Sequence, residues 1–247
     1  MLNNKIERLL FLLLWFIFII FLRILFPIQN IDLEITIQYI LSSTFLTSVV
    51  WCLCIKIRNK SIKKKINSYY YKNDFSNCLQ YIDTCIMKNP NLKWLKFERL
   101  FALALQGNIT EYQANLQQYQ INNLIKRKKY AAIVQEYNNL FLFFSRNKID
   151  FAAPDNRGLS YLNKSNYLLS IINTENYDEI ISCAMDIYCS PYLLFKSFSA
   201  LVLSETYNAL NDDFNRKIYA VKAREYSPST EILQCVNEHL SSMDTSL

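Results

Sequence analysis

The chain has 247 residues, of which 51% are hydrophobic and 15% aromatic, and this composition excludes general disorder. Only two glycines and five prolines occur, which argues against glycine-rich phosphate loops and tight β-hairpins and favours an all-α fold. Residues 1–65 hold nine Lys/Arg against three Asp/Glu, whereas residues 66–247 hold eighteen of each. Nucleic acid is therefore not expected as a partner, because its binding depends on neutralising phosphates.

Two apolar segments near the N-terminus predict a transmembrane hairpin over residues 1–58. Residues 9–22 contain no polar side chain, and the first span extends to about residue 26 if Arg23 reaches the interface. Residues 35–55 carry no formal charge and are long enough for a second span. The alternatives are a buried hairpin of a soluble protein and, for the first segment alone, a signal peptide. No small-residue cleavage site follows it.

The charges next to the second span predict its orientation. Six cations and no acid follow it, namely Lys56, Arg58, Lys60, Lys63, Lys64 and Lys65. Because positive residues stay on the cytoplasmic side, both termini are expected in the cytoplasm of a cell-membrane protein. Arg23 alone argues for the opposite orientation. Residues 59–68 are interpreted as a basic juxtamembrane linker that also contacts anionic lipid headgroups, at about 1 kcal/mol per cation.

Residues 69–107 predict two helices joined by a turn. The apolar or small positions of the first helix recur at helical spacing: Phe75, Cys78, Leu79, Ile82, Cys85 and Ile86. Asp74 provides an N-terminal cap, and Pro90 ends the helix. A second helix is expected from Trp94 to Leu105, followed by a turn at Gly107.

A second pair of similar segments lies further along the chain. Residues 177–191 align without gaps on residues 214–228, and the offset is 37 residues. An aromatic residue opens each segment, and Ser-Pro closes both. Leu203, Ser204 and Tyr207 precede the later segment.

These residues resemble the tetratricopeptide repeat, a helix-turn-helix unit of about 34 residues. Asn73, Asp74 and Phe75 stand at its turn, Cys78 and Cys85 at its small positions, and Pro90 at its closing proline. The resemblance implies an α-solenoid of antiparallel helix pairs over residues 69–240. Residues 241–247 are expected to form a frayed tail. It also implies a partner groove lined by Trp94, Phe97, Phe101, Leu201, Glu205 and Asn208. Any amphipathic all-helical domain is the alternative explanation, and the aromatic set on the first unit is equally compatible with a core.

The region between the two similar pairs is expected to contain one or two helices, over residues 112–145. A cationic run, Lys126 to Lys129, is interpreted as a solvated helix face, with a lipid or phosphate contact as the alternative. Residues 140–144, LFLFF, cannot all lie on one helical face, so most are expected in the core. Residues 146–160, which include Pro154 and Gly158, are the expected loop between the two halves.

The sequence offers no pattern typical of an enzyme, a metal site or a cofactor site. The seven cysteines lack a paired metal-ligand spacing and are expected to be reduced, with Cys78, Cys85 and Cys183 on buried faces. His239 is expected at the surface or at a helix end. The pairs Asp178–Glu179 and Asp212–Asp213 adjoin helix starts and are interpreted as caps. An enzyme would instead need a reactive cysteine, Cys189 or Cys235, or an acid pair with a strongly perturbed pKa.

The resulting hypothesis is a membrane-anchored, cytoplasm-facing scaffold or adaptor that binds a protein or peptide partner through its helical domain. The alternative is an accessory subunit of a membrane complex, for assembly or transport, that is recognised through its transmembrane helices. Under that alternative the hydroxyl-rich face of the second span, at Ser43 and Thr47, would carry recognition.

Overall fold

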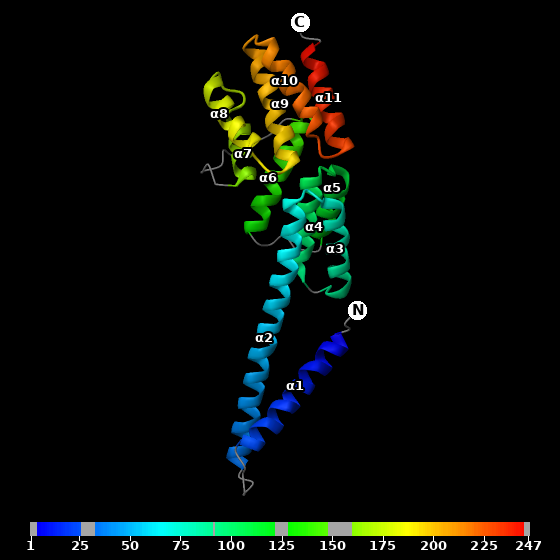
Figure 1. Ribbon diagram of the computed structural model, residues 1–247, viewed down its shortest axis with the longest axis vertical. Coiled ribbons are helices and arrows are strands. Elements are labelled where there is room, and N and C mark those ends of the chain that lie inside the picture. The colour runs from blue at the N-terminus through cyan, green and yellow to red at the C-terminus, as the bar shows by residue number, and fades with distance from the viewer. Residues whose placement is uncertain (1–3, 26–32, 91, 122–127, 148–159, 245–247) are drawn as a thin grey trace. The chain divides into compact units, whose positions relative to one another are not determined.

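The computed structural model describes residues 4–25, 33–90, 92–121, 128–147 and 160–244, and these form α-helices and no strand (Figure 1). The all-α prediction is confirmed. In chain order the helices are α1 (Asn4–Leu25), α2 (Leu33–Tyr71), α3 (Phe75–Lys88), α4 (Lys93–Gln106), α5 (Ile109–Ile121), α6 (Lys128–Phe144), α7 (Tyr161–Ile171), α8 (Tyr177–Tyr188), α9 (Leu193–Ala209), α10 (Asp213–Glu225) and α11 (Thr230–Asp244).

The chain divides into two compact units. The first unit comprises Met1–Ser68 and Asp83–Leu92, and the second comprises Tyr69–Ile82 and Lys93–Leu247. The first unit therefore holds α1 and most of α2, and the second holds the helices from α4 to α11.

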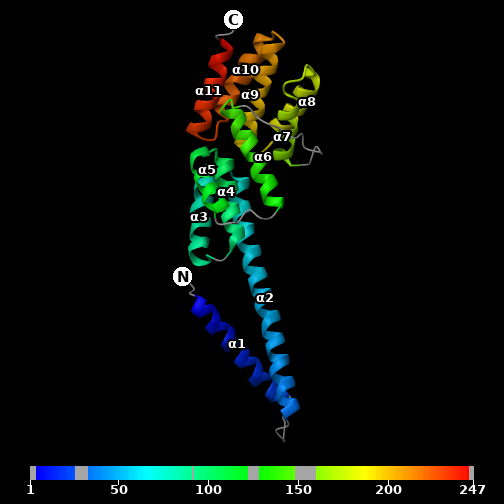
Figure 2. The ribbon, with the colours of Figure 1, turned by 180° about the vertical axis from the view of Figure 1, so that it is seen from behind.

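In the first unit α1 and α2 lie closest where α1 ends and α2 begins, and they diverge toward the N-terminus of α1, as both ribbon views show (Figures 1 and 2). The indole Nε1 of Trp15 donates a hydrogen bond of 3.1 Å to Thr44 Oγ1. The rings of Phe11 and Trp51 meet edge to face, with centroids 5.9 Å apart. Within the described residues, α2 is the one helix long and apolar enough to cross a membrane, over Ile40–Tyr71. The apolar part of α1 is shorter, Leu10–Ile24.

The segment assigned to a linker, residues 59–68, is helical and continues α2 without interruption to Tyr71. Its helical spacing separates two kinds of side chain. Ile62 and Ile66 are buried, whereas Lys63, Lys64 and Lys65 are exposed. The basic tract is therefore part of a regular helix that buries one apolar stripe and exposes its lysines.

Four helices end in the same turn, in which one residue adopts a positive φ. These residues are Asn73 (53°), Gly107 (74°), Arg146 (54°) and Asn211 (57°), after α2, α4, α6 and α9. In each turn the backbone N–H of the next residue donates to the carbonyl oxygen five positions before it, as in a Schellman motif. The bonds are Asp74 to Tyr69 (3.0 Å), Asn108 to Leu103 (3.1 Å), Asn147 to Leu142 (2.9 Å) and Asp212 to Tyr207 (2.9 Å).

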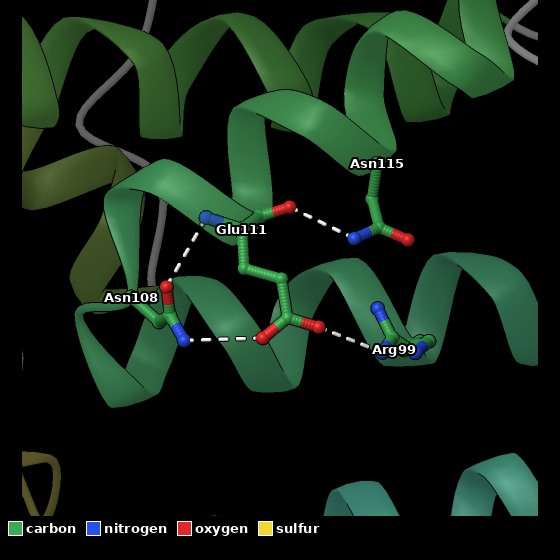
Figure 3. A network of polar contacts seen from close by, with 4 residues as sticks. All are labelled: Arg99, Asn108, Glu111 and Asn115. Atoms are coloured by element: carbon green, nitrogen blue, oxygen red, sulfur yellow. Dashed lines mark hydrogen bonds and ion pairs between the residues drawn. The ribbon is translucent and has the colours of Figure 1, made fainter.

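The turn after α4 also starts the next helix, as Figure 3 shows. Asn108 Oδ1 accepts the backbone N–H of Glu111 at 3.1 Å, and Glu111 Oε2 accepts Asn108 Nδ2 at 3.1 Å. Arg99 of α4 donates to Glu111 Oε1 at 2.8 Å, which ties the two helices together beside the turn. Asp74 and Asp212 cap α3 and α10 in the same position, by accepting the backbone N–H three residues on.

The core of the second unit is built from packed helix pairs, an arrangement compatible with a helical-repeat fold. Helix α9 packs against both α8 and α10, and α6 packs against α7. Most of the LFLFF run is buried as expected, with Leu142 half-buried. Phe198 of α9 lies edge to face with Phe143 of α6, with ring centroids 5.1 Å apart.

Several of the sequence-based expectations can be compared with the structure residue by residue. Residues 112–145 contain two helices, α5 and α6, and Phe75, Cys78, Ile82 and Cys85 are buried on α3. Cys183 is half-buried rather than fully buried. Residues 241–244, assigned to the frayed tail, belong to α11. Pro154, Gly158, Lys126, Arg127 and residues 245–247 lie outside the described residues.

Candidate functional site

The candidate site is a pocket of about 620 Å³ in the second unit. The end of α6, the turn between α7 and α8, the last part of α9 and the middle of α11 form its walls. Leu169 and Ile180 supply part of an apolar floor, because they are buried between these helices. The charged wall residues are Arg146, Glu175 and Glu205, which with His239 counted as neutral carry a formal charge of −1.

A chain of hydrogen bonds across the pocket joins three helices. His239 Nδ1 of α11 lies 2.8 Å from Glu205 Oε1 of α9, and His239 Nε2 lies 2.9 Å from the carbonyl oxygen of Phe143 on α6. Because a carbonyl oxygen only accepts, Nε2 carries the hydrogen. His239 therefore holds the Glu205 carboxyl in a fixed position.

The prediction that His239 lies at the surface or at a helix end is wrong, because the residue is only 5% exposed. Its neighbours on α11, Ile232, Val236 and Leu240, are buried as well. This stripe has helical spacing, so the apolar pattern of the last helix contained the signal that places His239 on its inner face.

The turn between α7 and α8 contributes hydrogen-bond acceptors. Thr174 Oγ1 donates to the carbonyl oxygen of Ile171 at 2.7 Å, which leaves its lone pairs for other groups. Glu175 is exposed at the pocket, and no described residue pairs with its carboxylate. This wall therefore favours a ligand that donates hydrogen bonds.

A smaller pocket, of about 280 Å³, lies between α5 and α6 and shares Asn147 with the larger one. Phe141 and Leu142 supply apolar surface there. Side-chain amides supply the polar surface, namely Gln113, Gln117, Asn138 and Asn147. Asn147, which follows the left-handed residue Arg146 at the end of α6, is the residue that lines both pockets.

The expected groove residues lie in different surroundings. Glu205 lines the larger pocket, whereas Leu201 is fully buried and Asn208 is half-buried on the same helix. On α4, Phe97 is buried and stacks on Tyr130, with ring centroids 3.9 Å apart. Trp94 and Phe101 are half-buried. Neither of the two pockets formed by the described residues is lined by a residue of the α4 set, and a groove through all six residues stays a prediction.

Cys78 and the acidic pair Asp212–Asp213 lie in surroundings that support a structural role. Burial, with the nearby acids Glu98 and Asp74, raises the pKa of the Cys78 thiol to about 12. Hydrogen bonds from Asn215 lower the pKa of Asp212, and Lys217 and Arg216 lower that of Asp213. No cluster of three or more potential metal ligands occurs in the described part of the chain.

No protein-family model, no curated protein and no solved structure matches this chain.

Proposed function

We propose that this protein is a membrane-anchored scaffold or adaptor whose helical second unit binds a protein or peptide partner. It acts by binding rather than by catalysis. The observation that carries the partner-binding part is the pocket at α6, α9 and α11, where charged and amide groups surround an apolar floor. Such a combination is typical of ligand-binding sites in proteins.

The membrane anchor is supported by the apolar side chains that α1 and α2 leave exposed. Only 11% of the most apolar window of α2 is buried. Phe16 on α1 is 63% exposed, and Leu41 and Phe45 on α2 are 64% and 69% exposed. Such a large apolar surface is unfavourable in water and favourable in lipid. We propose that α1 and the first part of α2 form a transmembrane hairpin.

The hydroxyl groups of α2 are compatible with a lipid environment. Ser43 donates to the carbonyl oxygen of Ile40 at 2.9 Å, and Thr47 to that of Ser43 at 2.7 Å. Both side chains are fully buried, and Thr47 shares a helical stripe with Thr44 and Trp51, which contact α1. Small hydroxyl residues of this kind let two helices approach closely in a membrane.

The basic tract of α2 supports an orientation with both termini in the cytoplasm. Its exposed lysines lie just beyond the apolar part of the helix, where they would contact anionic lipid headgroups. A cysteine-accessibility experiment tests this orientation. Cysteines introduced at Ser68 and at Ser246 should both react with an impermeant reagent only after the cells are permeabilised. Labelling of either in intact cells would contradict the orientation.

Crosslinking tests the adaptor function. Partners are captured from the native membrane by the full-length protein and by residues 66–247 attached to an unrelated membrane anchor. Capture of the same partner by both supports recognition by the helical unit. Capture by the full-length protein alone would show that recognition lies in α1 and α2.

The second candidate function is an accessory subunit recognised through its membrane helices. It is favoured by the exposed face of α2 at Leu41 and Phe45, which α1 leaves open. Ser43 and Thr47 are already buried against the rest of the chain, so they are poor probes of a partner. Leu41→Ala with Phe45→Ala should abolish partner capture under this function. Under the adaptor function the same double variant should leave capture unchanged.

A further inference from the structure

We propose that the two pockets that meet at Asn147 form one site for an extended polypeptide segment that carries a lysine. This inference rests on the proposed adaptor function and names the class of partner. Asn147 lines both the 620 Å³ pocket and the 280 Å³ pocket. In this proposal a single extended chain fills one pocket and continues past Asn147 into the other. We call this combined surface the Asn147 site.

Side-chain amides are the main polar groups along the Asn147 site. They are Gln113, Gln117, Asn138, Asn147 and Asn173. Within the described part of the chain, none of these side chains makes a hydrogen bond. Each amide offers both a donor and an acceptor, as does each peptide unit of a bound main chain. The surface is therefore complementary to free main-chain N–H and C=O groups.

This complementarity selects an extended segment over a helix. In an α-helix the main-chain groups are already paired within the helix, so amide side chains gain little by contacting it. An extended segment leaves its N–H and C=O groups available along its whole length. Apolar side chains of the same segment can rest on Phe141 and Leu142, which line the smaller pocket.

The larger pocket selects the side chain that enters it. The Glu205 carboxyl has one oxygen, Oε1, in contact with His239, which leaves Oε2 as an acceptor. Thr174 uses its hydrogen on Ile171 and offers only lone pairs, and Glu175 adds a second carboxylate. These groups all accept hydrogen bonds, so they favour a cationic donor over an acidic side chain.

Lysine fits this pocket better than arginine. A guanidinium binds a carboxylate most strongly as a fork that contacts both of its oxygens, and His239 already occupies one oxygen of Glu205. An ammonium needs a single oxygen and can donate its remaining hydrogens to Thr174 and Glu175. Arg146 is the one cation on the wall, and it can donate to main-chain carbonyl groups of the ligand.

The test uses the full-length protein in lipid nanodiscs and a random decapeptide library. We expect the enriched peptides to share a lysine. The best peptide is then synthesised with lysine, arginine or glutamate at that position, and with single main-chain N-methyl groups. Fluorescence anisotropy should show the affinity order lysine, arginine, glutamate, with about tenfold or greater loss for glutamate and for N-methylation in the central residues.

Variants of the protein locate the binding. Glu205→Gln keeps a hydrogen bond to His239 but removes the charge, and Asn147→Ala removes the shared amide. Glu175 is exposed, so the variant Glu175→Gln should fold like the wild type. Each variant should lower the affinity for the lysine peptide about tenfold. The matched control Glu225→Gln, at an exposed position on α10, should leave this affinity unchanged.

Four results would overturn the inference: no enriched peptide, no preference for lysine, no effect of N-methylation, or equally tight binding of lysine amide alone. The last result would indicate a site for a small amine. These results leave the adaptor function intact if the tethered second unit still captures its partner from membranes. A lysine peptide bound with the stated preference, but no partner captured by that unit, would reject the adaptor function alone.

Discussion

Ser229 Oγ donates a hydrogen bond of 2.7 Å to the carbonyl oxygen of Gly107, a residue 122 positions earlier in the chain. Ser229 also caps α11, since its Oγ accepts the backbone N–H of Ile232 at 3.1 Å. A similar contact joins another turn to a later one, because Asn73 Nδ2 donates to the carbonyl oxygen of Pro191 at 2.9 Å. Each of these two left-handed turns is therefore hydrogen-bonded to a loop between two later helices. The turn at Gly107 is bonded to the loop between α10 and α11, and the turn at Asn73 to the loop between α8 and α9.

Gly107→Ala should destabilise the second unit more than any exposed turn substitution. A Cβ at this position would lie 2.6 Å from Ile232 Cγ1, and the φ of 74° is unfavourable for alanine. We expect a loss of about 2 to 4 kcal/mol, which combines backbone strain and steric overlap. Chemical unfolding of the full-length protein in detergent measures it.

Asn211→Ala is the matched control, because Asn211 has a similar φ of 57° but is exposed. It should cost only the backbone strain, about 1 kcal/mol. Equal losses for the two variants would contradict the steric role of the contact between Gly107 and Ile232.

Ser229→Ala should remove both the cap of α11 and the bond to Gly107. We expect a loss of about 1 to 2 kcal/mol, the usual cost of a missing N-cap. Ser182→Ala, at an exposed position on α8, should stay within about 0.5 kcal/mol of the wild type. Thermal unfolding under identical detergent conditions compares the two, and a neutral Ser229→Ala would argue against the cap.

Asn166→Leu should break a buried amide network between α6 and α7. Asn166 Oδ1 accepts from Asn139 Nδ2 at 2.9 Å, and both side chains are buried. Loss of one partner leaves the other without its bond, at a cost of about 1 to 3 kcal/mol. The double variant with Asn139→Leu should lose less than the sum of the two single losses. Additive losses from a double-mutant cycle would exclude this coupling.

Cys78 should resist alkylation at neutral pH. Burial raises the pKa of its thiol to about 12, so almost none of it is the reactive thiolate. Cys189 is exposed and should be modified first. Mass spectrometry after timed treatment with iodoacetamide at pH 7.5 gives the order, and early labelling of Cys78 would show that α3 opens readily.

Asp213→Asn should destabilise the protein at neutral pH and lose this effect in acid. Lys217 and Arg216 lower the pKa of Asp213 in the folded state below its ordinary value of 3.8. The ionised carboxylate therefore stabilises the fold above that value, and this contribution is lost as the pH falls through the folded pKa. Unfolding midpoints of the wild type and the variant should converge at low pH, and a constant difference would contradict the ion pairs.

Local structure was largely predictable from residue pattern. Pro90 and Asp74 set the ends of α3, and Gly107 marks the turn after α4, because backbone sterics and capping act over a few residues. The left-handed turns at Arg146 and Asn211 were not predicted, because arginine seldom adopts a positive φ and an asparagine alone does not specify one. Their positive φ follows from the closing hydrogen bonds of the preceding helices.

The sequence by itself determined the all-α class, the apolar character of the two N-terminal segments and the basic tract that follows them, because these depend on composition and residue spacing. The structure decided that this basic tract continues α2 as a helix. The tertiary structure alone decided which side chains meet at the candidate site. Glu205 and His239 are 34 residues apart, and Phe143 is 96 residues before His239. Contacts between helices depend on packing over the whole core, which local spacing does not specify.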